Sequence, residues 1–286
     1  MTKISNLHKN PIIITGANGG LGREVTDFCL RNNKPVIMAC RNTDKAERVR
    51  QDFIQKYNLS SSEIAVLPLD LSSFETIINF ADTIKRNNIK PIALVNNAGT
   101  IERNYKQNEN GFELTLATNY LGPYLLTRLL LPEMPKFSSI VNTESLTGYN
   151  TKISSDLFSI SADNYSQLGA YSRSKAALMY FTASLSAKTE GNYYVNAADP
   201  GIVDTGIITL HRWFDPLANI LFRPFIRKPK RGAIPICKAL SSEQTGFIYK
   251  LRHSKPLPSK FFNNSIAELL WDKTEEELSD YFKSLS

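Results

Sequence analysis

Short apolar segments alternate with helical stretches from Asn10 to about Ala198. Within each segment the apolar residues follow one another without a break. Such continuous runs are typical of strands buried on both faces of a sheet, whereas strands with one exposed face are apolar at every second residue. The regular repetition of strand and helix predicts an α/β fold. The strands are expected at 12–14, 36–40, 64–69, 92–95, 139–143 and 193–197, and the helices at 21–31, 43–57, 74–86, 112–131 and 166–189.

The same alternation predicts a parallel sheet with helices on both of its faces. We expect a three-layer, Rossmann-type, doubly wound parallel sheet of about seven strands in the order 3-2-1-4-5-6-7, with right-handed crossovers. A helix at 233–240 and a last strand at 246–249 continue the pattern. Because the sequence contains no internal repeat and no linker, residues 1–286 are predicted to form one domain.

The alternation stops between Pro200 and Arg231, where the sequence is irregular. Such a stretch is too long for a simple connection, so we expect a lid over a binding site at about 202–232. An amphipathic segment at about 264–286 is expected to add a C-terminal helical extension. Small-molecule pockets are mostly apolar, and the lid predicts a bulky apolar substrate because it contains Trp213, Phe214, Leu217, Ile220, Leu221, Phe222 and Phe225.

Charge and cysteine content exclude little. The net charge of +7 would suit an acidic partner, but it is also ordinary for a soluble protein, and we expect no nucleic-acid partner. The three cysteines and three histidines are scattered without metal-ligand spacing, so we expect no metal site and a reduced, cytoplasmic protein. We see no apolar signal-peptide core at the N-terminus and no run approaching the ~18 residues of a membrane span.

The stretch TGANGGLG at 15–22 joins the first predicted strand to the first helix. Its spacing, Gly16-x3-Gly20-x-Gly22, is a relative of the dinucleotide-binding fingerprint. Glycine permits positive φ and close backbone approach, and the start of a helix offers free N–H groups to an anion. A glycine-rich turn without a ligand is the alternative, but the flanking strand and helix favour a phosphate-binding loop.

The end of the second strand indicates which dinucleotide would bind. NAD-binding sites usually carry an acidic residue there, whereas this chain has Cys40 and then Arg41. A cation suits a 2′-phosphate, so we predict NADP(H), although Arg41 could equally be a solvated surface charge. Asp70 ends the third strand, where it would accept a hydrogen bond from the adenine amino group or cap the helix starting near Ser73.

Three further motifs follow in order: NNAG at 96–99, YSRSK at 171–175 and DPGIVDT at 199–205. Together with the glycine-rich loop, they resemble the short-chain dehydrogenase/reductase family over about residues 10 to 205. The segments ACRN, LDLSS and NYLGPYLLT are more similar to the retinol-dehydrogenase-like and protochlorophyllide-reductase-like branch, whose members mostly use NADP(H). The resemblance therefore implies a nicotinamide-dependent oxidoreductase.

The YSRSK motif supplies a candidate acid/base pair. Tyr171 and Lys175 are four residues apart and share one face of a helix. A tyrosine with a pKa of about 10 is a poor base at neutral pH, but a nearby ammonium and an oxidised nicotinamide ring favour its phenolate. Ser145, at the end of the fifth strand, would hydrogen-bond the reacting oxygen. The resemblance adds Asn119 as the family's helix-bending asparagine, which carries a water to the lysine.

The strand ends and the resemblance together give the predicted cofactor site. In DPGIVDT, the backbone of Val203 would bond the nicotinamide carboxamide, and Thr205 would reach a cofactor phosphate or amide. Besides Tyr171 and Lys175, the cofactor-binding residues are predicted to be Gly16, Asn18, Gly20, Leu21, Gly22, Arg41, Asn42, Asp70, Leu71, Asn97, Ala98, Gly99, Pro200, Gly201, Val203 and Thr205.

Two features depart from the family pattern. Glu144 stands where the family usually has a serine before Ser145. If its side chain points outward, as strand alternation allows, the effect is small; if it points toward the nicotinamide, activity is in doubt. The second departure is an insert at about 150–168, which is expected to form part of the pocket wall.

These features predict hydride transfer between NADP(H) and a carbonyl or alcohol of a steroid, retinoid, quinone or aromatic aldehyde. A C=C reductase on the same fold is one alternative, and a non-catalytic NADP(H)-binding sensor or scaffold, suggested by Glu144, is another. The basic and aromatic run RPFIRKPKR also fits weak peripheral contact with a membrane. Pairing of helices 112–131 and 166–189 between subunits, which is common in the family, would give a homo-oligomer.

Overall fold

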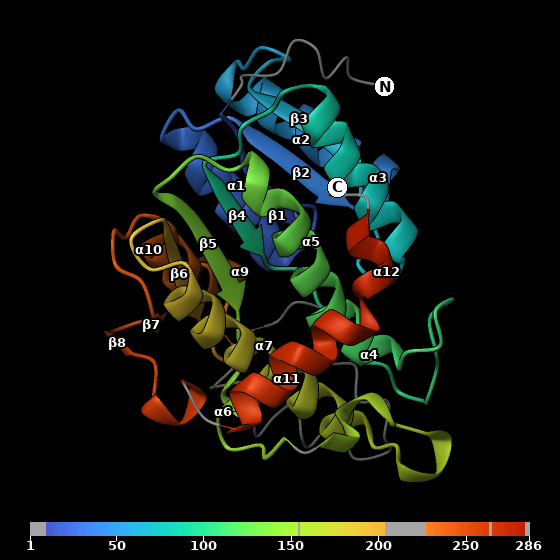
Figure 1. The fold of residues 1–286 in the computed structure, drawn as a ribbon. Helices are drawn as coiled ribbons and strands as arrows, with labels where there is room; N and C mark the ends of the chain where they lie inside the picture. Colours follow the sequence, from blue (N-terminus) through green and yellow to red (C-terminus); the bar gives the residue numbers. More distant parts are fainter. Residues whose placement is uncertain (1–9, 154, 204–226, 263–264, 284–286) are drawn as a thin grey trace, which may run out of the picture.

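The computed structural model describes residues 10–153, 155–203, 227–262 and 265–283. Eight of its strands form one sheet in the order β3-β2-β1-β4-β5-β6-β7-β8 (Figure 1). The predicted doubly wound α/β fold is thus confirmed. The strands are β1 (Ile12–Thr15), β2 (Val36–Cys40), β3 (Ile64–Pro68), β4 (Ala93–Asn96), β5 (Ser138–Thr143), β6 (Tyr193–Ala198), β7 (Phe247–Tyr249) and β8 (Ser254–Pro256).

The prediction of about seven strands missed β8. The first seven strands pair in parallel, but β8 pairs antiparallel with β7 as the edge of the sheet. Its three residues, Ser254, Lys255 and Pro256, are all exposed. Short edge strands often carry lysine and proline, which resist pairing with other chains and also remove the apolar signal of a strand.

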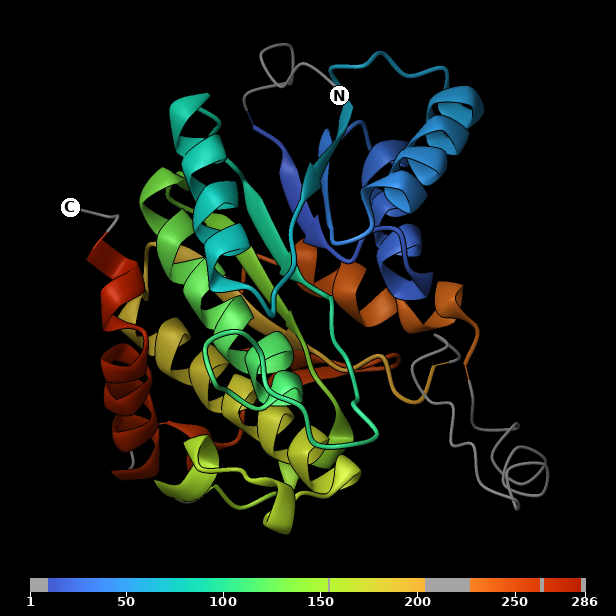
Figure 2. The same cartoon turned by 90° about the vertical axis from the view of Figure 1, so that its right-hand side faces the viewer.

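Helices cover both faces of the sheet, as Figure 2 shows. On one face, α1 (Gly20–Arg31), α2 (Thr43–Tyr57) and α10 (Ile234–Leu240) bury one apolar core. On the other face, α3 (Phe74–Arg86), α5 (Gly122–Leu130) and α7 (Gln167–Lys188) bury a second. The chain reverses its direction across the sheet after β3, so crossovers of constant hand place the later helices on the opposite face.

Short helical turns complete the described part of the chain. The α-helical ones are α4 (Leu114–Leu116), α6 (Leu146–Tyr149), α9 (Pro229–Gly232) and α12 (Ser279–Phe282). The 3-10 turns are Leu131–Glu133, Ser155–Phe158, Ala162–Asn164 and Ser259–Phe261. The described residues stop at Val203 and resume at Arg227. Most of the lid predicted at about 202–232 therefore lies outside them.

The stretch expected as one helix at 112–131 has three parts. After α4, a π-helical turn runs over Ala117–Leu121, and α5 begins at Gly122. A Cβ atom on Gly122 would lie only 2.3 Å from the Leu71 carbonyl oxygen, so α5 packs directly on the chain that follows β3. Pro123 has no N–H and is accommodated in the first turn of α5, which is why the regular helix restarts there.

The C-terminal helix α11 (Ser265–Glu277) lies across α5 and α7 (Figure 1). The Trp271 ring contacts the rings of Tyr124, on α5, and Phe181, on α7. The Glu275 carboxylate accepts hydrogen bonds from the Tyr124 hydroxyl and, at 2.6 Å, from Arg128 Nη1. This aromatic and ionic contact fixes α11 on the two helices through which subunits were expected to pair.

We predict that replacing Glu275 with Ala lowers the free energy of unfolding by about 1–3 kcal/mol, because the buried Tyr124 hydroxyl loses its acceptor and Arg128 loses its ion-pair partner. Denaturant unfolding measures the loss. Glu276→Ala, at an exposed position of the same helix, is the control and should change stability by no more than about 0.5 kcal/mol. Equal losses in the two variants would contradict the assigned contact.

Among the residues that the structure describes, no helix has both the length and the apolar character needed to cross a bilayer.

Candidate active site

The glycine-rich loop turns tightly between β1 and α1. Gly16 has φ +64°, and a Cβ atom on Gly22 would lie 2.3 Å from the Gly16 carbonyl oxygen. Only glycine fits such an approach without displacing the helix. Gly20 begins α1. The N-cap residue, Gly19, has no side chain that could cap the helix, and the first turn contains no acidic residue. The loop therefore leaves the start of α1 open to an anion.

Polar side chains join this loop to its neighbours. Asn18 Nδ2 donates to the carbonyl of Asn42 at 3.1 Å, which ties the loop to the end of β2. The Thr15 hydroxyl accepts from the backbone N–H groups of Asn97 and Ala98, both at 2.9 Å. Thr15 was not among the residues predicted for the site. It ends β1, and the expected strand order already placed β1 next to β4, the strand that leads into NNAG.

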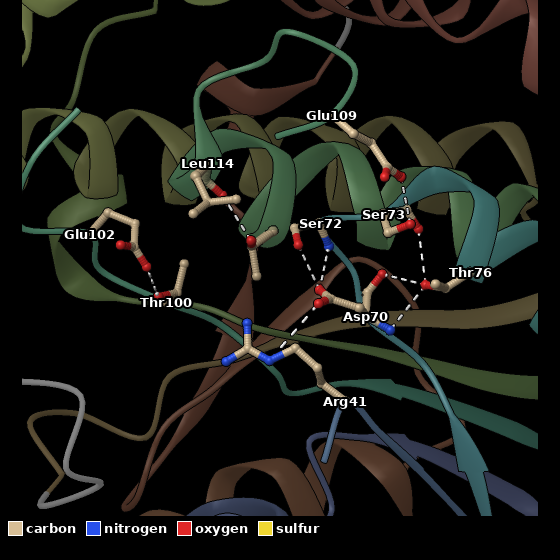
Figure 3. A network of polar contacts seen from close by, with 10 residues as sticks. Arg41, Asp70, Ser72, Ser73, Thr76, Thr100, Glu102, Glu109 and Leu114 are labelled. Carbon is tan, nitrogen blue, oxygen red and sulfur yellow. Dashed lines mark hydrogen bonds and ion pairs between the residues drawn. The ribbon is translucent and has the colours of Figure 1, made fainter. Parts of the chain in front are cut away.

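Arg41 and Asp70 meet at the ends of β2 and β3 (Figure 3). Arg41 Nε lies 3.9 Å from Asp70 Oδ2, and the arginine side chain is 78% exposed. Asp70 Oδ1 accepts from the N–H of Ser72 at 3.0 Å and from its hydroxyl at 2.7 Å, which fixes the turn before α3. Asp70 therefore orders the turn before α3 but does not cap the helix, whose N-cap is Ser73 without a side-chain hydrogen bond; most of the Arg41 side chain stays exposed and available to an anion.

Other predicted cofactor residues have clear structural roles. The Asn42 side chain caps α2 by accepting from the Lys45 N–H at 2.8 Å. A Cβ atom on Gly99 would lie 3.1 Å from Asn119 Oδ1 and 3.9 Å from Lys175 Nζ, so Gly99 lets NNAG lie close to these two side chains. Leu71 is buried under α5, and Leu21 lies against α9.

The Pro-Gly segment after β6 is held by Arg227. Gly201 has φ +73°, and its N–H donates to Asp199 Oδ1 at 2.8 Å. Arg227 Nη1 donates to the Pro200 carbonyl at 2.8 Å, and Val203 forms an isolated parallel bridge with Arg227. Thr205 lies outside the described residues.

Ser145 and Tyr171 converge beyond the carboxyl end of β5. Ser145 caps the short helix α6, its Oγ accepting from the Thr147 N–H at 3.4 Å, and its hydroxyl lies close enough to the Tyr171 phenol to lower the pKa of that group. A Cβ atom on Gly148 would lie 2.7 Å from the carbonyl carbon of Lys175, so α6 packs directly on the backbone of α7. This close packing brings the serine, which follows a strand, to the tyrosine, which lies on a helix.

Lys175 lies one helical turn after Tyr171 and is 5% exposed. Its Nζ atom donates to the Thr143 carbonyl at 2.7 Å and lies 6.0 Å from the centre of the Tyr171 ring. Burial lowers the pKa of Lys175, and the Glu144 carboxylate opposes that change. The hydrogen bond to the Thr143 carbonyl therefore holds the ammonium on the same side of the site as the Tyr171 ring.

Asn119 is fully buried in the π-helical turn. Its side-chain N–H groups donate to the Thr100 carbonyl at 2.9 Å and to Ser174 Oγ at 3.1 Å. Its Oδ1 accepts from the Thr100 N–H at 2.8 Å. Because both amide hydrogens are used, the side chain positions the loop after β4 against α7.

Burial raises the pKa of Tyr171 to about 12, while the nearby Ser145 side chain opposes the rise. The negative charges of Glu144 and Asp199 raise this pKa further. Without a cofactor, the phenol is therefore held in its protonated form, as an acid.

Glu144 does not point outward, so that alternative was wrong. Its side chain is 2% exposed. Asn142 lies two residues before Glu144, so strand alternation places both side chains on the same face of the sheet. Asn142 Nδ2 donates to the hydroxyl of Thr182, on α7, at 2.9 Å. Strand alternation therefore directs Glu144 toward α7 as well, because that face of β5 is covered by the helix. Burial raises the pKa of Glu144 to about 8, although the Lys175 ammonium opposes the rise.

Comparisons with known proteins agree with this geometry. A family model described as short chain dehydrogenase matches residues 10–212, which include both the glycine-rich loop and the Tyr171–Lys175 pair. Retinol dehydrogenase 14 of Mus musculus is 32% identical over 289 residues, with 94% of this chain and 86% of the relative covered. Polyprenol dehydrogenase of Homo sapiens is 31% identical over 279 residues, covering 92% and 83%. The solved structure of an uncharacterized protein from Mycobacterium Paratuberculosis has a TM-score of 0.73 at 28% identity, covering 95% of this chain and 94% of that one.

Proposed function

The chain belongs to the short-chain dehydrogenase family, in its retinol-dehydrogenase-like branch, and from that membership we propose an NADP(H)-dependent oxidoreductase acting on a bulky apolar alcohol or carbonyl compound. The observation that carries this proposal is the convergence of Ser145, Tyr171 and Lys175 at the edge of the sheet where the uncapped start of α1 also lies. In parallel α/β sheets, ligands bind at this carboxyl edge.

The residues at this edge fit a dinucleotide phosphate. The close approach of Gly22 to Gly16 keeps side chains away from the open first turn of α1, which suits a pyrophosphate. Arg41 extends from the end of β2 with most of its side chain exposed, as a 2′-phosphate requires. When bound, the dinucleotide supplies or accepts the hydride at C4 of its nicotinamide ring.

The chain's own residues supply the proton. During reduction, the Tyr171 phenol donates its proton to the carbonyl oxygen, and during oxidation the phenolate withdraws one from the alcohol. Ser145 Oγ hydrogen-bonds the same oxygen and stabilises the charge that develops on it. The buried Lys175 ammonium, held by the Thr143 carbonyl, keeps positive charge beside the phenol.

Exposed apolar side chains beside the catalytic residues support an apolar substrate. Leu146 directly follows Ser145 and is 56% exposed, and Leu168, three residues before Tyr171, is 65% exposed. Ile202, in the Pro-Gly segment, is 46% exposed. Large apolar side chains exposed next to a polar site commonly line a ligand pocket. Retinol and polyprenol, named in two relatives, are both long apolar isoprenoid alcohols.

The test is turnover of purified protein with a panel of aldehydes, followed by loss of NADPH absorbance. We expect kcat/KM for long isoprenoid aldehydes to exceed that for small charged carbonyl compounds by at least about tenfold, because each buried CH₂ contributes roughly 0.8 kcal/mol. A preference for small charged substrates would overturn the substrate class. NADPH binding without turnover of any substrate would favour the sensor or scaffold, and reduction of a C=C bond alone would favour the C=C reductase.

Cofactor preference has its own test. We predict that Arg41→Ala raises the Kd for NADPH by about ten- to a hundredfold and leaves the Kd for NADH nearly unchanged, because only NADPH carries the 2′-phosphate. Arg31→Ala, at the opposite end of α1, is the control and should affect neither cofactor. Equal losses for both cofactors would refute 2′-phosphate recognition by Arg41. The cytoplasmic location, the homo-oligomer and the membrane contact stay predictions from the sequence.

A further inference from the structure

The Glu144 carboxylate is buried without a hydrogen-bond partner. Neither of its oxygen atoms has one among the described residues. The nearby Thr182 hydroxyl donates instead to the Leu178 carbonyl at 2.8 Å. The Glu144 N–H donates to the Ala198 carbonyl at 2.8 Å, which fixes the backbone of the residue at the end of β5. A carboxyl group held in this way acts on its surroundings through its charge, not through a hydrogen bond.

Several titratable groups on neighbouring elements interact electrostatically with Glu144. Lys175 and Tyr171 come from α7, Tyr149 from α6, and Asp199 from the end of β6. Asp199 is itself paired with Lys250, which follows β7, at 3.6 Å. The Lys175 ammonium donates to the Thr143 carbonyl and forms no ion pair with Glu144 among the described contacts. The interaction of Glu144 with Lys175 and Tyr171 therefore acts through space.

We propose that Glu144 is a positioning residue for proton transfer: through its charge, it makes the proton affinities of Lys175 and Tyr171 depend on its own ionisation. This inference rests on the proposed function, in which those two side chains move the proton. It adds a residue that the predicted catalytic group did not contain, and it gives a role to a carboxyl group placed beside Ser145.

The sign of the effect follows from the charges. Glu144, with a pKa raised to about 8, is neutral in acid and becomes an anion as the pH rises through that value. The anion raises the pKa of both Lys175 and Tyr171. Carbonyl reduction consumes the phenol proton, so a raised pKa extends reduction to more alkaline pH. Alcohol oxidation needs the phenolate, so the same change slows oxidation there.

Kinetics of Glu144→Gln test this sign. For alcohol oxidation, the ratio of kcat/KM in E144Q to that in the wild type should be near one at about pH 6 and rise to about three- to tenfold at about pH 9. E144D, which keeps the charge, should stay close to the wild type. E133Q, which removes a carboxyl group just before β5, is the control and should show no pH-dependent ratio. A ratio independent of pH would overturn the proposal.

A second measurement needs neither cofactor nor turnover. The titration of isotope-labelled Lys175 can be followed by NMR in the cofactor-free protein, with K175M to assign its signal. The midpoint should fall in E144Q and stay near the wild-type value in E144D; E144S provides a second neutral variant if E144Q folds poorly. An unmoved midpoint in the neutral variants overturns the role of Glu144. A moved midpoint in a protein without turnover instead contradicts the proposed function and leaves the charge effect standing.

Discussion

Tyr171→Phe is expected to reduce kcat for carbonyl reduction by about a hundred- to ten-thousandfold and to leave the Kd for NADPH within about twofold. Phenylalanine keeps the ring but lacks the hydroxyl that lies near Ser145 and that donates the proton in the proposed reaction. The phosphate-binding groups at the start of α1 and at Arg41 do not depend on that hydroxyl. Single-turnover kinetics and titration of NADPH fluorescence separate the two quantities.

Tyr180→Phe is the matched control for this experiment, because Tyr180 lies on the same helix, where its ring packs against Phe261. Its kcat should remain within about twofold of the wild type. Retention of more than about a tenth of wild-type turnover in Y171F would show that another group supplies the proton. A loss of NADPH binding in Y171F would instead indicate that the substitution damages the whole site.

Gly22→Ala is expected to weaken NADPH binding by at least about tenfold and to lower the free energy of unfolding by about 1–3 kcal/mol. The new methyl group would lie 2.3 Å from the Gly16 carbonyl oxygen and 2.8 Å from the Ala17 Cα. Both contacts are with backbone, so α1 has to move away from β1. That movement changes the loop on which the proposed phosphate site depends. Calorimetric titration with NADPH and denaturant unfolding measure the two losses.

Gly19→Ala provides the comparison within the same loop. Gly19 has φ −95°, and a Cβ atom there would meet the Gly16 carbonyl oxygen at 3.4 Å, an ordinary contact. G19A should therefore change stability by less than about 0.5 kcal/mol and NADPH affinity by less than about threefold. Similar behaviour of G19A and G22A would mean that the close approach at Gly22 is not what shapes the site.

The local signals of the sequence were sufficient for the sheet and its helices. Continuous apolar segments such as 36–40 must be buried on both faces, which predicted a sheet covered by helices on both sides, and the order expected for a Rossmann-type fold is the one observed for the first seven strands. The resemblance implied a helix bend at Asn119, and the π-helical turn at Ala117–Leu121 contains that residue, but the apolar pattern alone predicted one regular helix there. The strand β8 has no apolar signal because it lies exposed at the edge of the sheet.

The sheet and its helices followed from the sequence, because runs of apolar residues and their spacing reflect the local geometry of the backbone. Several candidate residues of the site followed from motifs that resemble a known family. What surrounds those residues became visible in the folded chain. The tertiary structure buried Glu144 beneath α7, used the Asn119 amide to hold Thr100, and placed the Thr15 hydroxyl under NNAG. Burial, charge and hydrogen bonding at one side chain depend on segments far away in the chain, so a local pattern does not contain them. The sequence around Glu144 does not include α7, the helix that covers its side chain.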